Sequence, residues 1–218
     1  MIDIGKKNFE KYSRQIMMRR IGINGQKKIM KSSICIIGCG GLGTTTAQYL
    51  AMTGVGKMIL IDFDNIELSN LNRQISFLET DIGKNKAEIL KKNILKINPE
   101  LDVSVIKKKI TSRNINLLIN DCKFIIDCSD NFKTRFLINE YCFKRKKILV
   151  SAALQNFDVQ IASFKAWSSK KNPCYECIFP RFSDAKVLNC DQMGVVSPIA
   201  GFGGIMQAIS VVNIVLGC

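Results

Sequence analysis

The pattern of apolar and polar residues predicts a chain that alternates between short buried strands and longer helices. Short apolar runs predict strands, and apolar residues that recur every three or four positions predict helices. The predicted strands are 33–38, 57–61, 102–106, 123–128, 147–152 and 159–165. The predicted helices are 42–52, 81–97, a segment near 112–119, and 132–144.

This alternation predicts an α/β fold. Strand–helix–strand connections cross over with a right hand and place helices on both faces of a parallel sheet. We therefore expect a Rossmann-like, mostly parallel sheet, with residues 159–165 as an antiparallel addition at its C-terminal side. Ligands bind beyond the carboxyl ends of the strands in such sheets, and the polar motifs of this chain follow those ends.

Two apolar segments lie outside this alternation. Residues 6–31 predict one or two amphipathic helices whose apolar positions are Phe9, Tyr12, Ile16 and Met17. Residues 195–218 carry no charged side chain, so their composition also suits a membrane span. Because this segment contains a proline, several glycines and polar side chains, we expect a helix of small residues buried against a neighbour.

The formal net charge of +14 would suit a nucleic-acid partner. The lysines are spread along the chain with no nucleic-acid-binding motif beside them, so we interpret them as solvated surface. We expect neither nucleic acid nor a membrane as a partner. The polar N-terminus is not typical of a signal peptide, and nine scattered cysteines do not resemble a disulfide framework, which indicates a cytoplasmic protein.

The sequence contains no histidine. This excludes a Ser-His-Asp triad, a Cys-His pair and any imidazole metal ligand. The chemistry must therefore depend on carboxylates, cations, cysteines, backbone amides or a metal.

A glycine-rich turn follows the first predicted strand. Gly38, Gly40 and Gly43 form a G-x-G-x-x-G pattern, with Gly41 as a further glycine. Such a turn approaches a phosphate closely, and the next helix directs its free amides at the anion. Asp62 ends the second strand, where it can accept hydrogen bonds from ribose hydroxyls. Alone, this pattern is typical of an NAD or FAD site.

The polar residues beyond the glycine turn are not typical of a dehydrogenase. Polar and charged residues follow the second strand, lie in the next helix and follow the fourth strand: Asp64, Asn70, Arg73, Gln74, Lys86, Asp130, Asn131 and Arg135. Hard cations such as Mg²⁺ bind carboxylate and phosphate oxygens together. The set therefore favours a triphosphate with Mg²⁺ over a dinucleotide.

These motifs resemble those of the MoeB/ThiF/HesA family, the bacterial relatives of ubiquitin-activating enzymes. The matching segments occur in order along nearly the whole chain: RQI, GCGGLG, LIDFDNIELSNLNRQ, Lys86, DCSDNFKTR, CxxC and NCDQMGVVSPIAG. The resemblance implies an adenylyltransferase. It would use ATP to activate the C-terminal Gly-Gly carboxylate of a ubiquitin-like sulfur-carrier protein, giving an acyl-adenylate and pyrophosphate.

The resemblance also implies roles for single residues. Gly41 and its neighbours would hold the nucleotide, Asp62 the ribose and Asp130 the Mg²⁺. Asn70, Arg73 and Lys86 would bind phosphates, with Asp64, Gln74 and Asn131 in the same site. Arg14 would reach the ATP of a partner subunit, which implies a homodimer. Without the resemblance, we would interpret Arg14 and Lys86 as surface cations. We would interpret Asp62 and Asp64 as acids that stabilise a turn or cap a helix, and Asp130 as the N-cap of the helix that follows it.

By this resemblance, residues 1–218 form one ThiF-type adenylation domain. Residues 1–32 would be its N-terminal helices, 33–165 its nucleotide-binding core, and 166–218 a CxxC and crossover loop with an interface helix. The family pattern has a second CxxC, and this sequence ends before one occurs. We therefore expect the chain to be truncated at its C-terminal end.

Three cysteines are candidates for chemistry. Cys174 and Cys177 have the spacing of half a tetrahedral zinc site, and we interpret them as remnants of a lost zinc site or as ligands of an incomplete one. Cys190 matches the position where some family members carry a reactive cysteine. An unreactive loop cysteine is the alternative, since only a thiolate is nucleophilic.

Two alternatives to adenylation remain. The glycine turn alone would suit an NAD- or FAD-binding oxidoreductase, and the missing C-terminal region would suit a noncatalytic homologue that only binds the carrier. Thiamine, molybdopterin and thiolation pathways all use enzymes with these motifs, so the sequence does not select a pathway.

Overall fold

The computed structural model describes residues 4–181 and 194–217. In this part of the chain, six strands form one sheet in the order β3-β2-β1-β4-β5-β6. The strands are β1 (Ser33–Ile37), β2 (Lys57–Ile61), β3 (Asp102–Ile106), β4 (Phe124–Asp127), β5 (Ile148–Gln155) and β6 (Asp158–Phe164). The first five strands run parallel and β6 pairs antiparallel with β5, which confirms the predicted fold class.

The order in which strands are added to the sheet changes direction at β1. Strands β2 and β3 lie on one side of β1, and β4 and β5 lie on the other. Ile37 at the end of β1 pairs in register with Ile61 of β2 and Asp127 of β4. The carboxyl ends of these three strands therefore meet at the switch point, where ligands of open α/β sheets bind.

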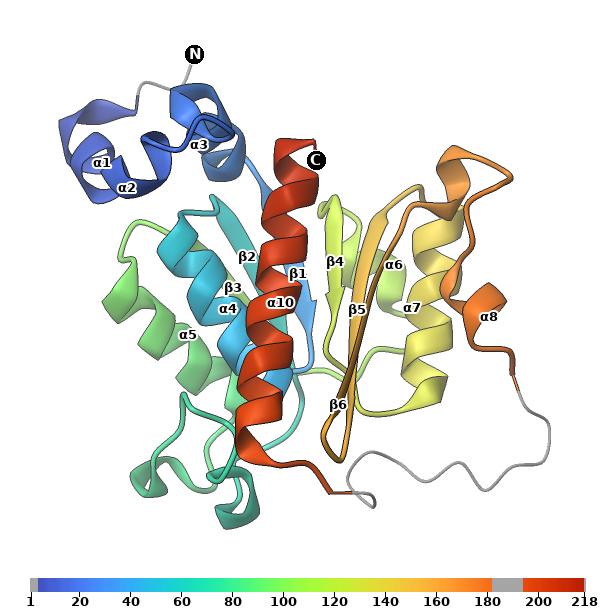
Figure 1. Cartoon of the computed structure of the whole chain (residues 1–218). Coiled ribbons are helices and arrows are strands. Elements are labelled where there is room, and N and C mark those ends of the chain that lie inside the picture. Colours follow the sequence, from blue (N-terminus) through green and yellow to red (C-terminus); the bar gives the residue numbers. More distant parts are fainter. Residues whose placement is uncertain (1–3, 182–193, 218) are drawn as a thin grey trace.

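Helices cover both faces of the sheet (Figure 1). Helices α4 (Gly41–Thr53), α5 (Lys86–Ile97) and α10 (Ser197–Leu216) pack on one face, and α6 (Ile115–Ile119) and α7 (Phe132–Lys144) pack on the other. Successive residues of β1 alternate between the two cores: Ile34 and Ile36 face the first, Cys35 and Ile37 the second. A strand buried on both faces explains why β1 reads as a continuous apolar run.

Two predicted helices differ from the structure at their starts. The predicted helix 81–97 begins only at Lys86, because Gly83 has a φ of +85° and Asn85 caps the helix by accepting from the Glu88 N–H at 3.2 Å. The segment near 112–119 is helical only over α6. The predicted helix over 132–144 has the same bounds as α7.

The N-terminal segment forms three short helices in the described residues: α1 (Gly5–Lys11), α2 (Ser13–Ile16) and α3 (Gly22–Met30). The sequence predicts one or two amphipathic helices for residues 6–31, and the structure differs both in their number and in which of the predicted apolar positions are buried. Tyr12 is buried, whereas Phe9 and Met17 are 49% and 76% exposed. The helix is interrupted at Tyr12, whose φ of −102° separates α1 from α2.

Helix α10 packs across α4 through small residues. A Cβ atom on Gly204 would lie 2.6 Å from the Cβ of Thr45, and one on Gly203 would lie 2.8 Å from Leu42. This close approach agrees with the predicted small-residue helix. Among the described residues, α10 is also the one helix with the length and apolar composition of a membrane span, and about a third of it is buried.

Between β6 and α10, the described residues include a 3₁₀ turn at Ala166–Ser168 and the short helix α8 (Tyr175–Ile178). Tyr175 packs in an aromatic cluster with Phe136, Phe164 and Phe179. This cluster fixes the segment that carries Cys174 and Cys177 against α7.

Candidate functional site

A cavity of about 720 Å³ lies at the carboxyl ends of the central strands. Its walls come from the turn after β1, the segments after β2 and β3, the start of α5, and the loop between β4 and α7. The predicted polar and glycine residues among its lining are Gly38, Gly40, Gly41, Asp62, Asp64, Asn70, Arg73, Gln74, Lys86, Asp130, Asn131 and Arg135. The sheet topology therefore brings residues separated by more than 90 positions to one place.

The glycines of the turn after β1 have different roles. Gly38 has a φ of +94°, and a Cβ there would lie 2.7 Å from the Cys128 carbonyl oxygen. Gly40 is the extended N-cap of α4, and Gly41 begins that helix. The free amides of the first helical turn therefore face the cavity and favour an anion.

Gly43 was predicted to bind the nucleotide, but it does not line the cavity. A Cβ on Gly43 would lie only 1.9 Å from the carbonyl oxygen of Gly38. Its lack of a side chain lets α4 pack closely on the turn. Gly43 thus shapes the site without facing it.

Asp62 joins the end of β2 to the glycine turn. Its Oδ2 atom accepts from the Cys39 N–H at 2.7 Å, and its Oδ1 atom accepts from the Asp64 N–H at 2.8 Å. Burial raises the pKa of Asp62, while these two hydrogen bonds and nearby Lys86 lower it in part. Asp62 is therefore a turn-stabilising acid and a wall of the cavity at the same time.

Lys86 begins α5 and is only 9% exposed. Its Nζ atom lies 3.4 Å from Oδ2 of Asp64, and its N–H donates to the Asp64 carbonyl oxygen at 3.0 Å. Asn85 donates to the carbonyl oxygens of Asp62 and Asp64. The lysine is thus held at the cavity by its own backbone and is not the solvated surface cation that its lysine-rich helix suggests.

The segment after β2 turns back over the cavity. Asn70 ends a 3₁₀ turn at Leu68–Asn70, and its side chain accepts from the Glu67 N–H at 3.1 Å. Arg73 donates from Nη1 to the Ser69 carbonyl oxygen at 3.0 Å, which directs its guanidinium along this wall. Gln74 is 3% exposed, and its Oε1 atom has no hydrogen-bond partner among the described residues.

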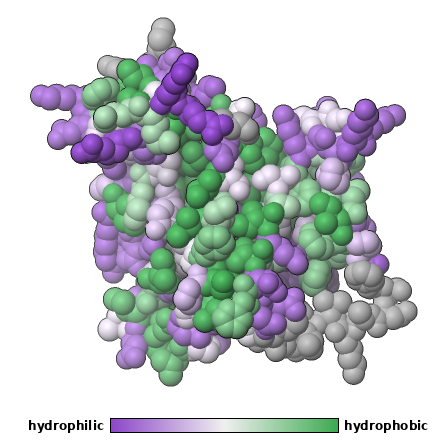
Figure 2. Space-filling view, viewed as in Figure 1, coloured by the Kyte–Doolittle hydropathy of each residue, from purple (hydrophilic) through white to green (hydrophobic). Residues whose placement is uncertain are grey.

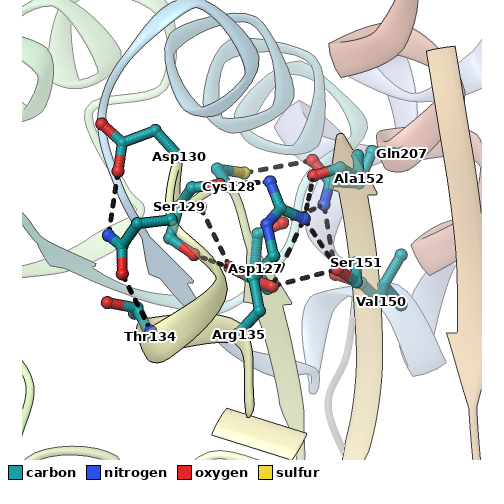
Figure 3. A network of polar contacts seen from close by, with 11 residues as sticks. Asp127, Cys128, Ser129, Asp130, Thr134, Arg135, Val150, Ser151, Ala152 and Gln207 are labelled. Atoms are coloured by element: carbon teal, nitrogen blue, oxygen red, sulfur yellow. Dashed lines mark hydrogen bonds and ion pairs between the residues drawn. The ribbon is translucent and has the colours of Figure 1, made fainter. Parts of the chain in front are cut away.

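The loop between β4 and α7 forms the opposite wall (Figure 3). Asp130 is exposed, and its Oδ1 atom accepts from the side-chain amide of Asn131 at 3.0 Å. Asn131 is the N-cap of α7, because its Oδ1 atom accepts from the Thr134 N–H at 2.9 Å. The capping role that the sequence allowed for Asp130 therefore belongs to Asn131, which leaves the Asp130 carboxylate at the cavity.

Sequence reasoning missed the residues after β3 that line the cavity. Lys108, Lys109 and Ile110 lie beside Phe63, which is half-exposed. The Nζ atom of Lys109 lies 5.3 Å from the centre of the Phe63 ring. The signal that could have found them is the end of β3 at Ile106, since residues after each central strand reach the same edge.

Other predicted site residues lie elsewhere. Arg14 is exposed on α2 and does not line the cavity. Cys190 lies outside the described residues.

The Sγ atoms of Cys174 and Cys177 are 3.5 Å apart, and the Sγ atom of Cys174 also accepts a hydrogen bond from the side-chain amide of Asn139 at 3.6 Å. Contact with Asn139 and Cys177 lowers the pKa of Cys174 against the effect of burial. The described part of the chain holds no cluster of three or more metal-ligating acids, cysteines or histidines.

The strand order, the glycine turn and the ring of cations and carboxylates define a Rossmann-like nucleotide-binding domain. The ThiF family pattern matches residues 12–218, and the chain belongs to this family.

Two curated relatives are named "Adenylyltransferase and sulfurtransferase MOCS3". The one from Culex quinquefasciatus is 35% identical over 208 residues, covering 95% of this chain and 47% of the relative. The one from Xenopus laevis is 36% identical, covering 95% and 46%. The chain thus spans about half the length of these relatives.

Solved structures of E. coli MccB share the fold. MccB with MccA-N7isoASN is 27% identical with a TM-score of 0.83, and the match covers 96% of this chain and 64% of that one. MccB with ATP is 26% identical with a TM-score of 0.76, covering 99% and 72%.

Proposed function

We propose that this chain is an ATP-dependent adenylyltransferase. Its substrate would be the C-terminal Gly-Gly carboxylate of a ubiquitin-like sulfur-carrier protein. The observation that carries this proposal is the cavity itself, where the glycine turn, Asp62, Arg73, Lys86 and Asp130 line one space. The names of the MOCS3 relatives and the solved complex of MccB with ATP support the same reaction.

The reaction needs no histidine. A carboxylate is already ionised at neutral pH, so its oxygen can attack the α-phosphorus of ATP without a general base. The new bond joins that oxygen to the α-phosphorus, and the bond from this phosphorus to the bridging oxygen of pyrophosphate breaks. Catalysis then consists of positioning the two substrates and neutralising the charge that develops on pyrophosphate.

The residues of the cavity fit this chemistry. The amides at the start of α4 would bind phosphate oxygens, and Asp62 would accept from the ribose hydroxyls. Asn70, Arg73 and Lys86 would bind the phosphates, beside Asp64 and Gln74. At an effective dielectric constant near 20, one charge pair at 4 Å contributes about 4 kcal/mol, so two cations are a substantial part of the binding free energy.

Asp130 fits a Mg²⁺ site. Its carboxylate is exposed at the cavity and oriented by Asn131, and Mg²⁺ is commonly held by one or two carboxylates together with substrate phosphates. Mg²⁺ would neutralise phosphate charge there.

We also propose that the protein acts as a homodimer. Arg14 lies outside its own cavity, so we infer that it serves the cavity of the partner subunit. The exposed apolar side chains of α10 and α4 suit a subunit interface; they are Phe202, Met206, Ile209, Tyr49 and Met52. Figure 2 shows apolar surface continuing over α10.

Two cysteine roles belong to this proposal. Cys174 and Cys177 would supply two thiolates to a Zn²⁺ ion, whose remaining ligands would come from other residues. The thiolate of Cys190 would attack the carbonyl carbon of the acyl-adenylate, forming a thioester and releasing AMP. The seven cysteines in the described residues are all free thiols, which suits the cytoplasm.

The test is ATP–pyrophosphate exchange with Mg²⁺ and a carrier protein that ends in Gly-Gly. A carrier without its last two glycines is the control. Exchange that requires the intact carrier supports adenylation, and its loss in Asp130→Ala and Arg73→Ala supports the site. Carrier binding without exchange would instead favour a noncatalytic homologue, and saturable NAD or FAD binding without ATP binding would favour an oxidoreductase.

A further inference from the structure

A buried polar network lies at the wall of the cavity that carries Asp130, and its members Ser129 and Arg135 belong to the cavity lining (Figure 3). Its centre is Asp127, the last residue of β4, whose side chain is 1% exposed. Oδ1 of Asp127 accepts from the N–H and the hydroxyl of Ser129 at 3.0 and 2.6 Å. Oδ2 accepts from the Ser151 hydroxyl at 3.0 Å. The loop after β4 is therefore tied back to the strand that it leaves.

Arg135 of α7 completes the network from the other side. It is only 3% exposed, and its Nη1 atom lies 3.8 Å from Oδ2 of Asp127. Nη1 donates to the Ala152 carbonyl oxygen at 2.8 Å, and Nη2 donates to the carbonyl oxygen of Ser129. Ser129 is thus held at its amide and hydroxyl by Asp127 and at its carbonyl by Arg135.

Gln207 holds the same strand ends from α10, on the opposite face of the sheet. Its Nε2 atom donates to the carbonyl oxygens of Asp127 and Val150 at 3.0 and 3.1 Å. Its Oε1 atom lies 3.1 Å from the Thr46 hydroxyl and from the Cys128 thiol. The network therefore connects the loop after β4 with β5, with α10 and with the helix that follows the glycine turn.

The sequence grouped Arg135 with the residues around the triphosphate. Arg135 does line the cavity, but the structure directs the donors named above at protein acceptors and pairs the guanidinium with Asp127. A phosphate-binding cation would keep its donors for the substrate. Asp130, the residue next to Ser129, points away from the network (Figure 3).

We propose that Arg135 is a positioning residue that sets the direction of the Asp130 carboxylate by holding the Ser129 carbonyl. This inference rests on the proposed role of Asp130 as a Mg²⁺ ligand. Arg135 would therefore act on the metal–nucleotide complex through the backbone of residues 128–130. Residues that orient metal ligands from behind typically change metal affinity about 10- to 100-fold when they are replaced.

The test compares Arg135→Lys with Ser151→Ala. Arg135→Lys keeps a cation beside Asp127 but loses the two hydrogen bonds from the guanidinium to the carbonyl oxygens of Ser129 and Ala152. Ser151→Ala removes two hydrogen bonds from the same network, the one to Oδ2 of Asp127 and the one of 3.3 Å from Nη1 of Arg135, and leaves the contact of Nη2 with the Ser129 carbonyl in place. Both variants weaken the network, and only the first releases the loop.

The first measurement is Mn²⁺ binding to the full chain in the presence of AMPCPP, followed by electron paramagnetic resonance. We expect Arg135→Lys to weaken Mn²⁺ binding about tenfold and Ser151→Ala to change it less than twofold. In an Asp130→Ala background, Arg135→Lys should have no further effect, because the two residues would act as one unit. Equal Mn²⁺ affinity in wild type and Arg135→Lys, or additive effects with Asp130→Ala, would overturn the proposal.

The second measurement needs no ligand. Amide hydrogen exchange of residues 128–131 should be faster in Arg135→Lys than in Ser151→Ala. Equal exchange rates in the two variants would overturn the proposal.

If Arg135→Lys does not fold, the double variant Asp127→Asn with Arg135→Gln, which replaces the ion pair by two neutral side chains, takes its place. If Mn²⁺ binding behaves as expected while no carrier supports exchange, the positioning role stands and the proposed activity fails. Wild-type protein that binds no Mn²⁺ with AMPCPP would overturn the role of Arg135.

Discussion

The carboxylate of Asp62 accepts a hydrogen bond of 2.7 Å from the main-chain N–H of Cys39. This bond joins the acid after β2 to the glycine turn after β1, so the proposed ribose and phosphate contacts belong to one rigid unit. Asp62 is also buried, which raises the pKa of this carboxylate. The conformation of the glycine turn and the proposed binding of ribose therefore depend on the same side chain.

The first prediction concerns pH. Because the pKa of Asp62 is raised, its carboxylate gains a proton at a higher pH than an ordinary aspartate, whose pKa is 3.8. The protonated form accepts hydrogen bonds from ribose less well, so ATP affinity should fall as the pH is lowered towards the pKa of Asp62. Isothermal titration of ATP between neutral and mildly acidic pH measures this.

Asp62→Asn is the reference for this titration, because ATP itself gains protons in the same range. The variant should bind ATP more weakly at neutral pH. Its ATP affinity should vary with pH only through the protonation of ATP itself, because the titrating carboxylate is gone. Identical pH profiles for the two proteins would exclude Asp62 as the titrating group.

The second prediction separates two glycines of one turn. Gly43→Ala would place a Cβ 1.9 Å from the Gly38 carbonyl oxygen, so we expect a loss of more than about 3 kcal/mol in the free energy of unfolding. At Gly40 the nearest atom to a new Cβ is 3.8 Å away, so Gly40→Ala should change stability by only about 1 kcal/mol or less. Urea unfolding of both variants measures the difference, and similar losses would contradict the packing role of Gly43.

The third prediction compares two lysines separated by one residue. Lys86 lines the cavity, whereas Lys84 is exposed and pairs with Asp81 at 3.1 Å. We expect Lys86→Ala to lower carrier-dependent pyrophosphate exchange about 100-fold, as the loss of one donor to a developing charge commonly does. Lys84→Ala should remain within about twofold of wild type, since exposed ion pairs contribute little. A comparable loss in both would mean that the general positive charge matters and the position does not.

The fourth prediction tests the proposed homodimer by complementation. Arg14→Ala and Asp130→Ala should each be inactive alone. If Arg14 serves the partner's cavity, a mixed dimer has one complete site, and an equal mixture should recover about a quarter of wild-type exchange. If Arg14 serves its own cavity, mixing restores nothing. The measurement requires subunits that have been allowed to exchange.

Much of this protein follows from its sequence alone. The bounds of β2, β3 and α7 agree with their predictions, because apolar periodicity is a local property of the chain. The alternation of strands and helices also predicts that the polar residues after the strands share one edge. Asp62, Arg73, Lys86 and Asp130 accordingly line a single cavity.

Other features were decided only by the tertiary structure. Contacts between distant segments bury Arg135 behind the loop after β4, make Gly43 a packing residue, and bring Lys109 to Phe63. The same holds for Phe9 and Met17, which the helical spacing assigned to an apolar helix face and the structure leaves exposed. Periodicity specifies which residues can share a face of one element. Long-range contacts decide which elements then pack against that face. This packing determines whether a side chain faces the cavity, a neighbouring element or water.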